Sequence, residues 1–239
     1  MKRTRPIIAR RRPIIAIDGP VGAGKSVAAR ELARELGYSY LNTGAMYRAV
    51  AVAARDAGID PGDPNVEERL KPVLAGLEIK FDGEKIFLNG RDISDKISHP
   101  EIGDLASRLS ALRAVRERMR ELQRAAGADG GVVMEGRDIG TAIFPDAEFK
   151  FYLDADIKVR VARRYEELKR KGASITEQEV LEQMIERDRR DSGRELAPLK
   201  RADDAIVIDS SKLSIKDVVA AMKAKINARI NASKDLKRA

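Results

Sequence analysis

The sequence predicts an α/β fold in which a doubly wound, five-stranded parallel sheet is flanked by helices. Short apolar runs alternate with longer segments of helical periodicity along most of the 239 residues, which is typical of parallel strands joined by crossover helices. The first apolar run, 14–17, leads directly into a glycine-rich loop and then a helix. An Asp-Gly and an Asn-Gly pair interrupt the alternation between 77 and 93, which indicates a small antiparallel insertion.

The glycine-rich loop has the spacing G-x-x-x-x-G-K-[ST], formed by Gly19, Gly24, Lys25 and Ser26. Glycines let successive backbone N–H groups converge on phosphate oxygens, and the following helix adds the positive end of its dipole. A tight turn with an incidental Lys-Ser pair is the alternative, but the flanking strand and helix favour a P-loop. The residues expected to bind the nucleotide are Gly19, Pro20, Val21, Gly22, Ala23, Gly24, Lys25, Ser26 and Val27.

Two side chains of this loop indicate the chemistry. Lys25 is expected to reach the β- and γ-phosphates of a nucleoside triphosphate, and the Ser26 hydroxyl is expected to bind Mg²⁺. The motif therefore predicts a nucleoside triphosphate and Mg²⁺ as the bound groups, without saying what happens to the phosphate.

The remaining elements follow in order. Apolar runs predict four further strands of the large sheet, and apolar positions at helical spacing predict the helices between them. Asp156, the Thr176–Glu179 box and Ser214 are expected to cap three of these helices. Pro61–Pro64 is expected to be a loop, and no internal repeat is recognised. The strands are 38–41, 132–134, 149–153 and 205–208, and the helices are 27–36, 44–57, 100–112, 114–126, 156–171, 176–190 and 214–230.

Composition narrows the classes of function. The chain has no cysteine, so disulfides and a cysteine nucleophile are excluded, and a reducing cytoplasm fits. No apolar run approaches the length of about 20 residues that a membrane helix needs, so no membrane partner is expected. The net charge of +8 raises nucleic acid as a partner, but aromatic residues are only 4%, which is few for base stacking. The basic tail 1–12 keeps a nucleic-acid-associated ATPase open as a rival.

Three arginine-bearing segments follow predicted strands and are expected at the carboxyl end of the sheet, where ligands bind in open α/β folds. They are 42–48, 135–138 and 186–194. Taken singly, each has a structural alternative: a helix-end contact, an ion pair or a solvated helix face. Their convergence near a P-loop instead predicts phosphoryl transfer, since arginine binds two phosphate oxygens at once.

From Ile14 to Ile226 the chain resembles the bacterial cytidylate kinases, a family of P-loop nucleoside monophosphate kinases. The most specific motifs are Thr-Gly-Ala-Met-Tyr-Arg at 43–48 and Glu-Gly-Arg-Asp-Ile-Gly-Thr at 135–141. Further matches are Ile17–Pro20, Arg163–Tyr165, Arg187-Asp188, Ala197–Leu199, Ala202–Ala205 and Asp209–Ser211. The basic tail and Val27, where the family often has Thr, depart from the pattern.

The resemblance implies a single kinase domain at 13–239 after the tail 1–12. Its core would comprise 13–62, 127–156 and 200–230. The acceptor-binding subdomain would cover about 63–126, including the antiparallel insertion, and a helical lid would cover about 157–175.

The resemblance also implies roles for individual residues. Lys25, Arg48, Arg137 and Arg194 would be catalytic, and Thr43 with these three arginines would hold the acceptor phosphate or the transferring group. Ser107, Arg116 and Asp138 would read the cytosine, and Arg187 and Asp191 would contact the sugar. Arg163 and Arg164 would contact the phosphates of ATP, and Ser26 would be the metal ligand.

The predicted reaction transfers the γ-phosphoryl group of ATP to CMP, and to dCMP, with Mg²⁺. A monomer acting on a small-molecule substrate is expected. A kinase of broader acceptor range that also takes UMP, and the nucleic-acid-associated ATPase, are the alternatives. The acceptor oxygen is already ionised, so the single histidine, His99, is not needed as a base.

Overall fold

A computed structural model describes residues 12–235 and divides the chain into two compact units. The first unit is formed by the chain up to Leu41, by Gly127–Ser192 and by the chain from Ala197 onward. The second unit is formed by Asn42–Ala126 and Gly193–Leu196. Residues 1–11, which make up nearly all of the predicted basic tail, lie outside the described residues.

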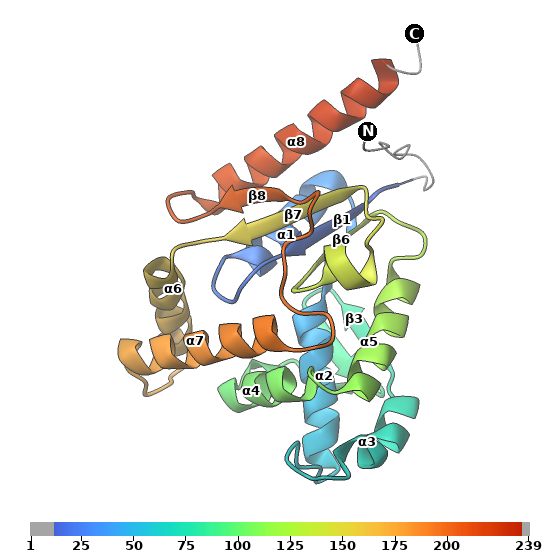
Figure 1. The fold of residues 1–239 in the computed structure, drawn as a ribbon, viewed down its shortest axis with the longest axis vertical. Helices are drawn as coiled ribbons and strands as arrows, with labels where there is room; N and C mark the ends of the chain where they lie inside the picture. The colour runs from blue at the N-terminus through green and yellow to red at the C-terminus, as the bar shows by residue number, and fades with distance from the viewer. Residues whose placement is uncertain (1–11, 236–239) are drawn as a thin grey trace. The chain divides into compact units, whose positions relative to one another are not determined.

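The first unit contains the predicted five-stranded parallel sheet, in the order β2-β6-β1-β7-β8 (Figure 1). Strand β1 lies between β6 and β7 and is paired in parallel with both. All of its residues are buried, as expected for a central strand of a parallel sheet. The strands are β1 (Ile14–Asp18), β2 (Ser39–Asn42), β6 (Val132–Gly136), β7 (Phe149–Asp154) and β8 (Ile206–Asp209). The fold class predicted from the sequence is therefore confirmed.

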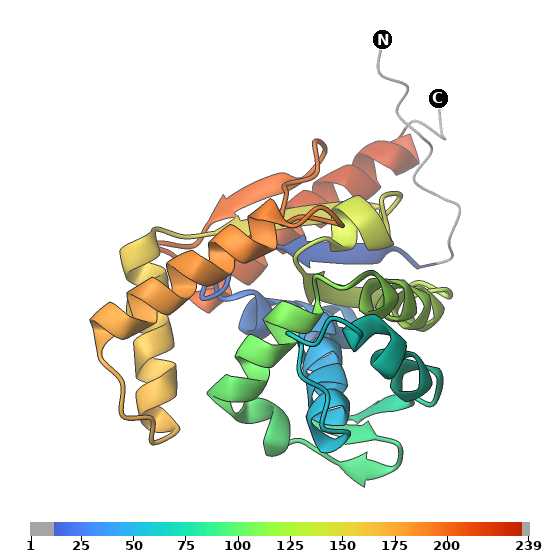
Figure 2. The same cartoon turned by 60° about the horizontal axis from the view of Figure 1, so that its bottom comes forward.

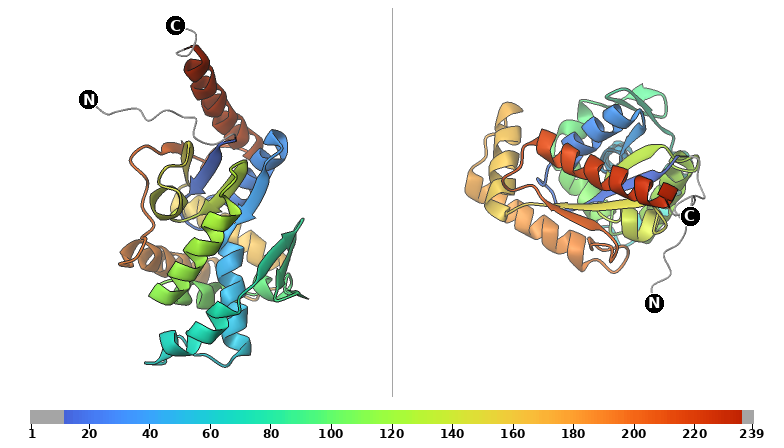
Figure 3. Two further views of the ribbon diagram at one scale, coloured as in Figure 1. Left: turned by 90° about the vertical axis from the view of Figure 1, so that its right-hand side faces the viewer. Right: turned by 90° about the horizontal axis from the view of Figure 1, so that it is seen from above.

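Helices α1 (Lys25–Leu36) and α8 (Ile215–Asp235) pack together on the sheet, and Figure 3 shows α8 in red lying across the strands. Their apolar side chains form one core with those of the strands. This core includes Ile15, Ile17, Ala28, Leu32, Phe149, Phe151, Val218, Met222 and Ile226. The sheet centre, and with it the loop after β1, is thus fixed by burial.

Helices α6 (Ile157–Arg170) and α7 (Glu177–Gly193) complete the first unit. Asp156 caps α6 by accepting the Lys158 N–H, and the predicted Thr176–Glu179 capping box opens α7. Ser214 and Asp217 form the same reciprocal pair at the start of α8. Helices α6 and α7 also share a small apolar cluster, formed by Val161, Leu168, Val180 and Met184. All three predicted caps are confirmed.

The second unit holds four helices and the predicted three-stranded antiparallel sheet (Figure 2). Asn89 and Gly90 both have positive φ angles, 49° and 78°, which is the turn that an Asn-Gly pair favours. The helices are α2 (Thr43–Asp56), α3 (Val66–Ala75), α4 (Pro100–Leu109) and α5 (Arg113–Ala126). The strands are β3 (Ile79–Asp82), β4 (Lys85–Leu88) and β5 (Arg91–Asp92), in the order β3-β4-β5.

Besides the short 3₁₀ turn Lys96–Ser98, two helical elements of the structure were not expected from the sequence. Helix α3 contains Pro72, yet its buried residues Val66, Leu70 and Leu74 have i, i+4, i+8 spacing, a signal that could have revealed it. The second is a π-helical turn, Ile139–Ile143, directly after β6. Among residues 12–235, none of the helices combines the length and the apolar character required to cross a bilayer.

Gly19 has no room for a side chain, because a Cβ atom there would lie 2.0 Å from the Leu153 carbonyl oxygen, at a φ of 148°. We expect Gly19→Ala to lower the free energy of unfolding by at least about 2 kcal/mol, as overpacking does. Gly37→Ala is the matched control, since Gly37 also has a positive φ, 61°, but no atom within 4 Å of the added Cβ. It should cost only about 1 kcal/mol. Equal losses in urea unfolding would show that backbone strain, not the contact, decides the effect.

Candidate functional site

The loop between β1 and α1 holds Lys25 in a buried position. Its side chain is 5% exposed, and its Nζ donates a hydrogen bond to the Pro20 carbonyl oxygen at 2.6 Å. Burial, and next the charge of Arg137, lower the pKa of Lys25 to about 7, while Glu135 and Asp18 oppose this shift. An ammonium group that is so poorly solvated gains strongly from a phosphate anion.

Ser26 follows Lys25, and its side chain lies near the phenol of Tyr40. That phenol in turn donates to Glu135 Oε1 at 2.8 Å. Burial, and then the Glu135 carboxylate, raise the pKa of Tyr40 well above its usual value, so the phenol keeps its proton. Tyr40 thus links the α1 start to the end of β6.

The donor set around Ser26 fits Mg²⁺ bound together with a nucleotide. Within the described part of the chain, no cluster of three or more His, Asp or Glu side chains is placed to hold a metal ion. Mg²⁺ usually keeps several waters and binds through one or two protein oxygens plus substrate phosphates. A single hydroxyl at the start of α1 is consistent with that mode.

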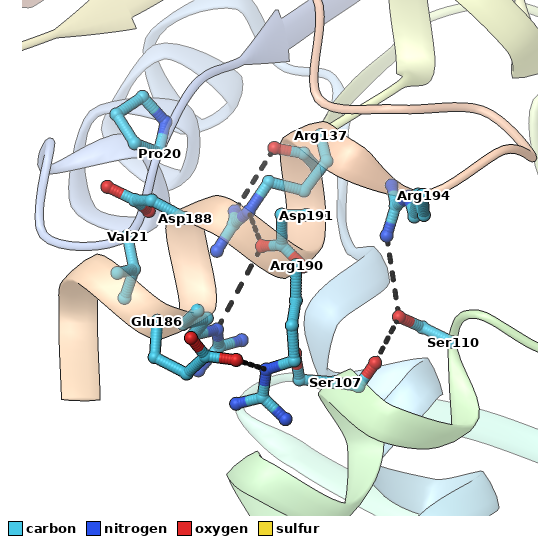
Figure 4. Close-up of polar contacts among 12 residues, drawn as sticks. Pro20, Val21, Ser107, Ser110, Arg137, Glu186, Asp188, Arg190, Asp191 and Arg194 are labelled. Carbon is cyan, nitrogen blue, oxygen red and sulfur yellow. Dashed lines mark hydrogen bonds and ion pairs between the residues drawn. The ribbon is translucent and has the colours of Figure 1, made fainter.

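Arg137 and Asp191 form an ion pair at the carboxyl end of β6, with Arg137 Nε 3.0 Å from Asp191 Oδ2 (Figure 4). Arg187 Nε lies 4.0 Å from the same carboxylate oxygen, one helical turn away on α7. Asp138, next to Arg137, is also buried. The structure therefore brings together two of the three predicted arginine segments, within the first unit.

Arg194, the last residue of the predicted segment 186–194, lies just beyond α7 and belongs to the second unit. Its guanidinium donates to Ser110 Oγ at 3.4 Å, and Ser110 Oγ donates to the Ser107 carbonyl at 2.8 Å. Figure 4 shows this chain of contacts. Within the segment 186–194, Arg187 and Asp191 therefore lie on α7, whereas Arg194 does not.

The second unit also buries two of the three residues assigned to the base. Arg116 on α5 and Ser107 on α4 are 5% and 7% exposed. The Arg116 guanidinium lies 5.6 Å from the centre of the Tyr47 ring. The Ser107 hydroxyl is buried and makes no hydrogen bond to any described residue. Buried hydroxyls are normally hydrogen-bonded, so this one is suited to a polar ligand.

Thr43 and Arg48 both lie on α2, which starts the second unit. Thr43 is buried at the first position of the helix, where the Asn42 side chain accepts the Ala45 N–H at 2.9 Å. The Arg48 guanidinium passes close to Gly103 of α4. These contacts fix both residues on a rigid helix.

Arg163 and Arg164, the predicted ATP contacts, lie on α6 in the first unit. Arg163 donates to Ser210 Oγ at 3.0 Å and to the Ser210 carbonyl at 2.7 Å. Ser210 Oγ itself donates to the carbonyl of Ala23 in the P-loop at 3.0 Å. Arg164 pairs with Glu167 at 2.7 Å. The structure therefore connects Arg163, more directly than Arg164, to the phosphate loop.

Arg160 is a residue of this region that sequence reasoning missed. It donates to the carbonyl of Val21 in the P-loop at 3.2 Å, to that of Ala155 at 3.1 Å and to Asp188 Oδ2 at 2.6 Å. A Cβ atom on Gly22 would lie 2.9 Å from the Arg160 carbonyl. The only sequence signal was its position one turn before Arg163.

Replacing Lys25 tests whether its burial costs stability. Burial disfavours the charged form, so we expect Lys25→Met to raise the free energy of unfolding at pH 7 by about 1 kcal/mol or more. The advantage should shrink from pH 7 towards pH 10, because there the unfolded lysine holds a proton that the folded one has released.

Thermal unfolding of both proteins across this pH range measures the difference. Exposed Lys216 provides the control, since Lys216→Met should leave stability nearly unchanged at every pH. A loss of stability in Lys25→Met would show that the ammonium is a net stabilising group.

Comparison with known proteins agrees with this geometry. A family model described as cytidylate kinase matches residues 15–228. A cytidylate kinase from Citrifermentans bemidjiense is 50% identical over 221 residues, covering 91% of this chain and 94% of that protein. One from Geobacter sulfurreducens is 46% identical over 228 residues, covering 94% and 97%. One from Thermotoga maritima is 41% identical over 217 residues, covering 91% and 98%. This chain therefore belongs to the cytidylate kinase family.

Proposed function

We propose that this chain transfers the γ-phosphoryl group of ATP to CMP, and to dCMP, giving ADP and CDP or dCDP. The observation that carries the choice of acceptor is that Ser107 and Arg116 are both buried in the second unit and that the Ser107 hydroxyl has no hydrogen-bond partner among the described residues. A hydroxyl and a guanidinium suit the oxygen and ring nitrogen of a pyrimidine edge.

Asp138 supports cytosine over uracil. A buried carboxylate accepts hydrogen bonds, and cytosine presents an exocyclic amino group that donates, whereas uracil presents a carbonyl oxygen at the same place. A carboxylate that faces that carbonyl oxygen would be costly. The proposal therefore ranks CMP above UMP.

The chemistry needs alignment and charge neutralisation rather than a base. An oxygen of the CMP phosphate, already ionised near pH 7, attacks the γ-phosphorus of ATP. A new P–O bond forms, the bond from the γ-phosphorus to the β–γ bridging oxygen breaks, and ADP leaves with the electron pair. Lys25 would neutralise the charge on the β- and γ-phosphates, and Arg137 would neutralise the charge on the phosphoryl group in transfer.

Other parts of the chain support these steps. Arg48, Arg194 and Thr43 would hold the acceptor phosphate, and Arg187 and Asp191 would contact the sugar. Arg163 and Arg164 would contact the phosphates of ATP from α6. When bound at Ser26, Mg²⁺ would add further neutralisation of the β- and γ-phosphates. A cytoplasmic, monomeric enzyme remains part of the proposal.

The decisive experiment is ADP release from ATP and Mg²⁺ with CMP, dCMP, UMP, AMP and GMP offered separately. Strong turnover with CMP and dCMP, weaker turnover with UMP and little with the purines is the expected result. Equal turnover with UMP would favour the kinase of broader range. ATP hydrolysis stimulated only by RNA would overturn the proposal in favour of the nucleic-acid-associated ATPase, which the family match does not favour.

Arg137 and Arg48 should each prove necessary for the chemical step. We expect Arg137→Ala or Arg48→Ala to lose at least about 2 kcal/mol of transition-state stabilisation, the scale of one preorganised donor. That loss corresponds to about a thirtyfold drop in kcat/KM. Arg34→Ala removes the same charge from an exposed ion pair on α1 and should leave kcat/KM unchanged. Turnover at the wild-type level in either test variant would refute the role of that arginine.

A further inference from the structure

Asp18 is a buried carboxylate that the roles described above do not use. It is the last residue of β1, it precedes the P-loop, and it is 5% exposed. Its Oδ1 accepts the backbone N–H of Ile139 at 2.9 Å, and its Oδ2 accepts that of Gly140 at 2.7 Å. Both carboxylate oxygens thus accept hydrogen bonds from one short segment, which begins 121 residues further along the chain.

That segment begins the π-helical turn Ile139–Ile143 after β6. The first N–H groups of any helix have no partner within it and need an acceptor. The residue before the turn, Asp138, does not cap it with its own side chain. Asp18 therefore supplies from another strand the capping that the local sequence does not.

Close packing holds the same segment against Asp18. A Cβ atom on Gly140 would lie 3.1 Å from Lys150 Cδ and 3.4 Å from Asp18 Oδ2. Lys150 in turn donates to the carbonyl of Pro145 at 2.6 Å and to Asp204 at 2.9 Å. The turn is thus anchored at its start by Asp18 and just beyond its end by Lys150.

Burying the Asp18 carboxylate disfavours its charged form. Burial raises the pKa of Asp18 to about 6, against the two backbone N–H groups that lower it. The neighbouring Asp138 raises it further and Lys25 lowers it. A carboxylate presents two acceptors in one plane, whereas an amide presents one acceptor and a donor. The geometry at Ile139 and Gly140 requires two acceptors.

We infer that Asp18 is a positioning residue, which ties the strand that leads into the P-loop to the segment that carries Arg137 and Asp138. The inference rests on the proposed function, in which those two residues serve the acceptor nucleotide. Asp18 would thereby hold the acceptor-binding groups in register with the donor-binding loop, without touching either substrate.

The strand that carries Asp18 is held by other interactions, whereas the segment at Ile139 and Gly140 relies on the Asp18 carboxylate. The backbone of Asp18 is fixed by the sheet, since it is in register with Gly136 on one side and Tyr152 on the other. The N–H groups of Ile139 and Gly140 depend on the carboxylate itself. Loss of the carboxylate should therefore disturb the acceptor side far more than the P-loop.

The test compares Asp18→Asn with Glu148→Gln. Glu148 is the matched control, because it is 8% exposed and its carboxylate accepts the N–H of Ile14 at 2.8 Å, at the opposite end of β1. In Asp18→Asn we expect kcat/KM for CMP to fall at least tenfold and the Kd for ATP to change less than twofold. Glu148→Gln should lower Tm and change neither kcat/KM for CMP nor the Kd for ATP by more than twofold.

Amide hydrogen exchange gives a second measurement that does not depend on turnover. In Asp18→Asn the amides of Ile139 and Gly140 should exchange at least tenfold faster, while the exchange rates of the P-loop amides stay unchanged. Should Asp18→Asn not fold, Gly140→Ala crowds the same contact, since its Cβ would lie 3.1 Å from Lys150 Cδ and 3.4 Å from Asp18 Oδ2. It should give the same loss of kcat/KM for CMP with little change in the Kd for ATP.

The outcomes separate the two hypotheses. Failure of the wild-type protein to phosphorylate CMP would reject the proposed function, and hydrogen exchange would still judge whether Asp18 fixes the turn. Unchanged exchange at Ile139 and Gly140, unchanged kinetics for CMP, or a parallel loss for ATP and CMP that Glu148→Gln reproduces would each overturn the positioning role.

Discussion

The burial of β1 between β6 and β7 is the constraint on which the rest of the structure depends. A strand that is hydrogen-bonded on both edges and buried on both faces cannot shift its register without exposing apolar side chains. Its last residue is therefore fixed, and so is the point from which the glycine loop departs. Lys25, Arg137 and Tyr152 are all placed by reference to this strand or its two neighbours.

Several buried charges of the first unit depend on this rigid frame. Four charged residues are at most 8% exposed: Lys25, Lys150, Arg160 and Asp191. In a deformable interior such side chains would reorient towards water. Each instead makes a hydrogen bond or ion pair with backbone carbonyls or with a group of opposite charge. Polar groups buried with partners on rigid elements are preorganised, and preorganised charge is what phosphoryl transfer requires.

Local sequence signals predicted most of the fold. The Asn-Gly turn, the Thr176–Glu179 box, the Ser214 cap and the glycine loop each depend on a few neighbouring residues, so a reader of the sequence can recognise them. Helix α3 was missed although its apolar residues have helical spacing, and the proline in its interior, Pro72, is untypical of a helix. The π-helical turn was missed because its N–H groups are satisfied by Asp18, which no local pattern connects to Ile139.

The candidate site shows the same division between local and distant information. The residues of the glycine loop follow from spacing, and the arginines at strand ends follow from the topology of parallel sheets. The roles of Arg160 and Asp188 could not be predicted, since they depend on a contact between α6, α7 and the loop. Whether a charged residue on a helix faces water or the interior is decided by tertiary packing, and a charge-rich sequence such as this one gives little guidance.

Because Arg160 contacts the P-loop, helix α6 cannot be exchanged independently of that loop. Gly22 leaves room for the backbone of Arg160, and the Arg160 guanidinium bonds the carbonyl of Val21 in return. Neither partner can change alone without a collision or an unsatisfied group. A chimaera that took α6 and α7 from a distant kinase would also have to take the P-loop of that kinase. The loop and these helices would therefore have to change together, although they lie more than a hundred residues apart in the sequence.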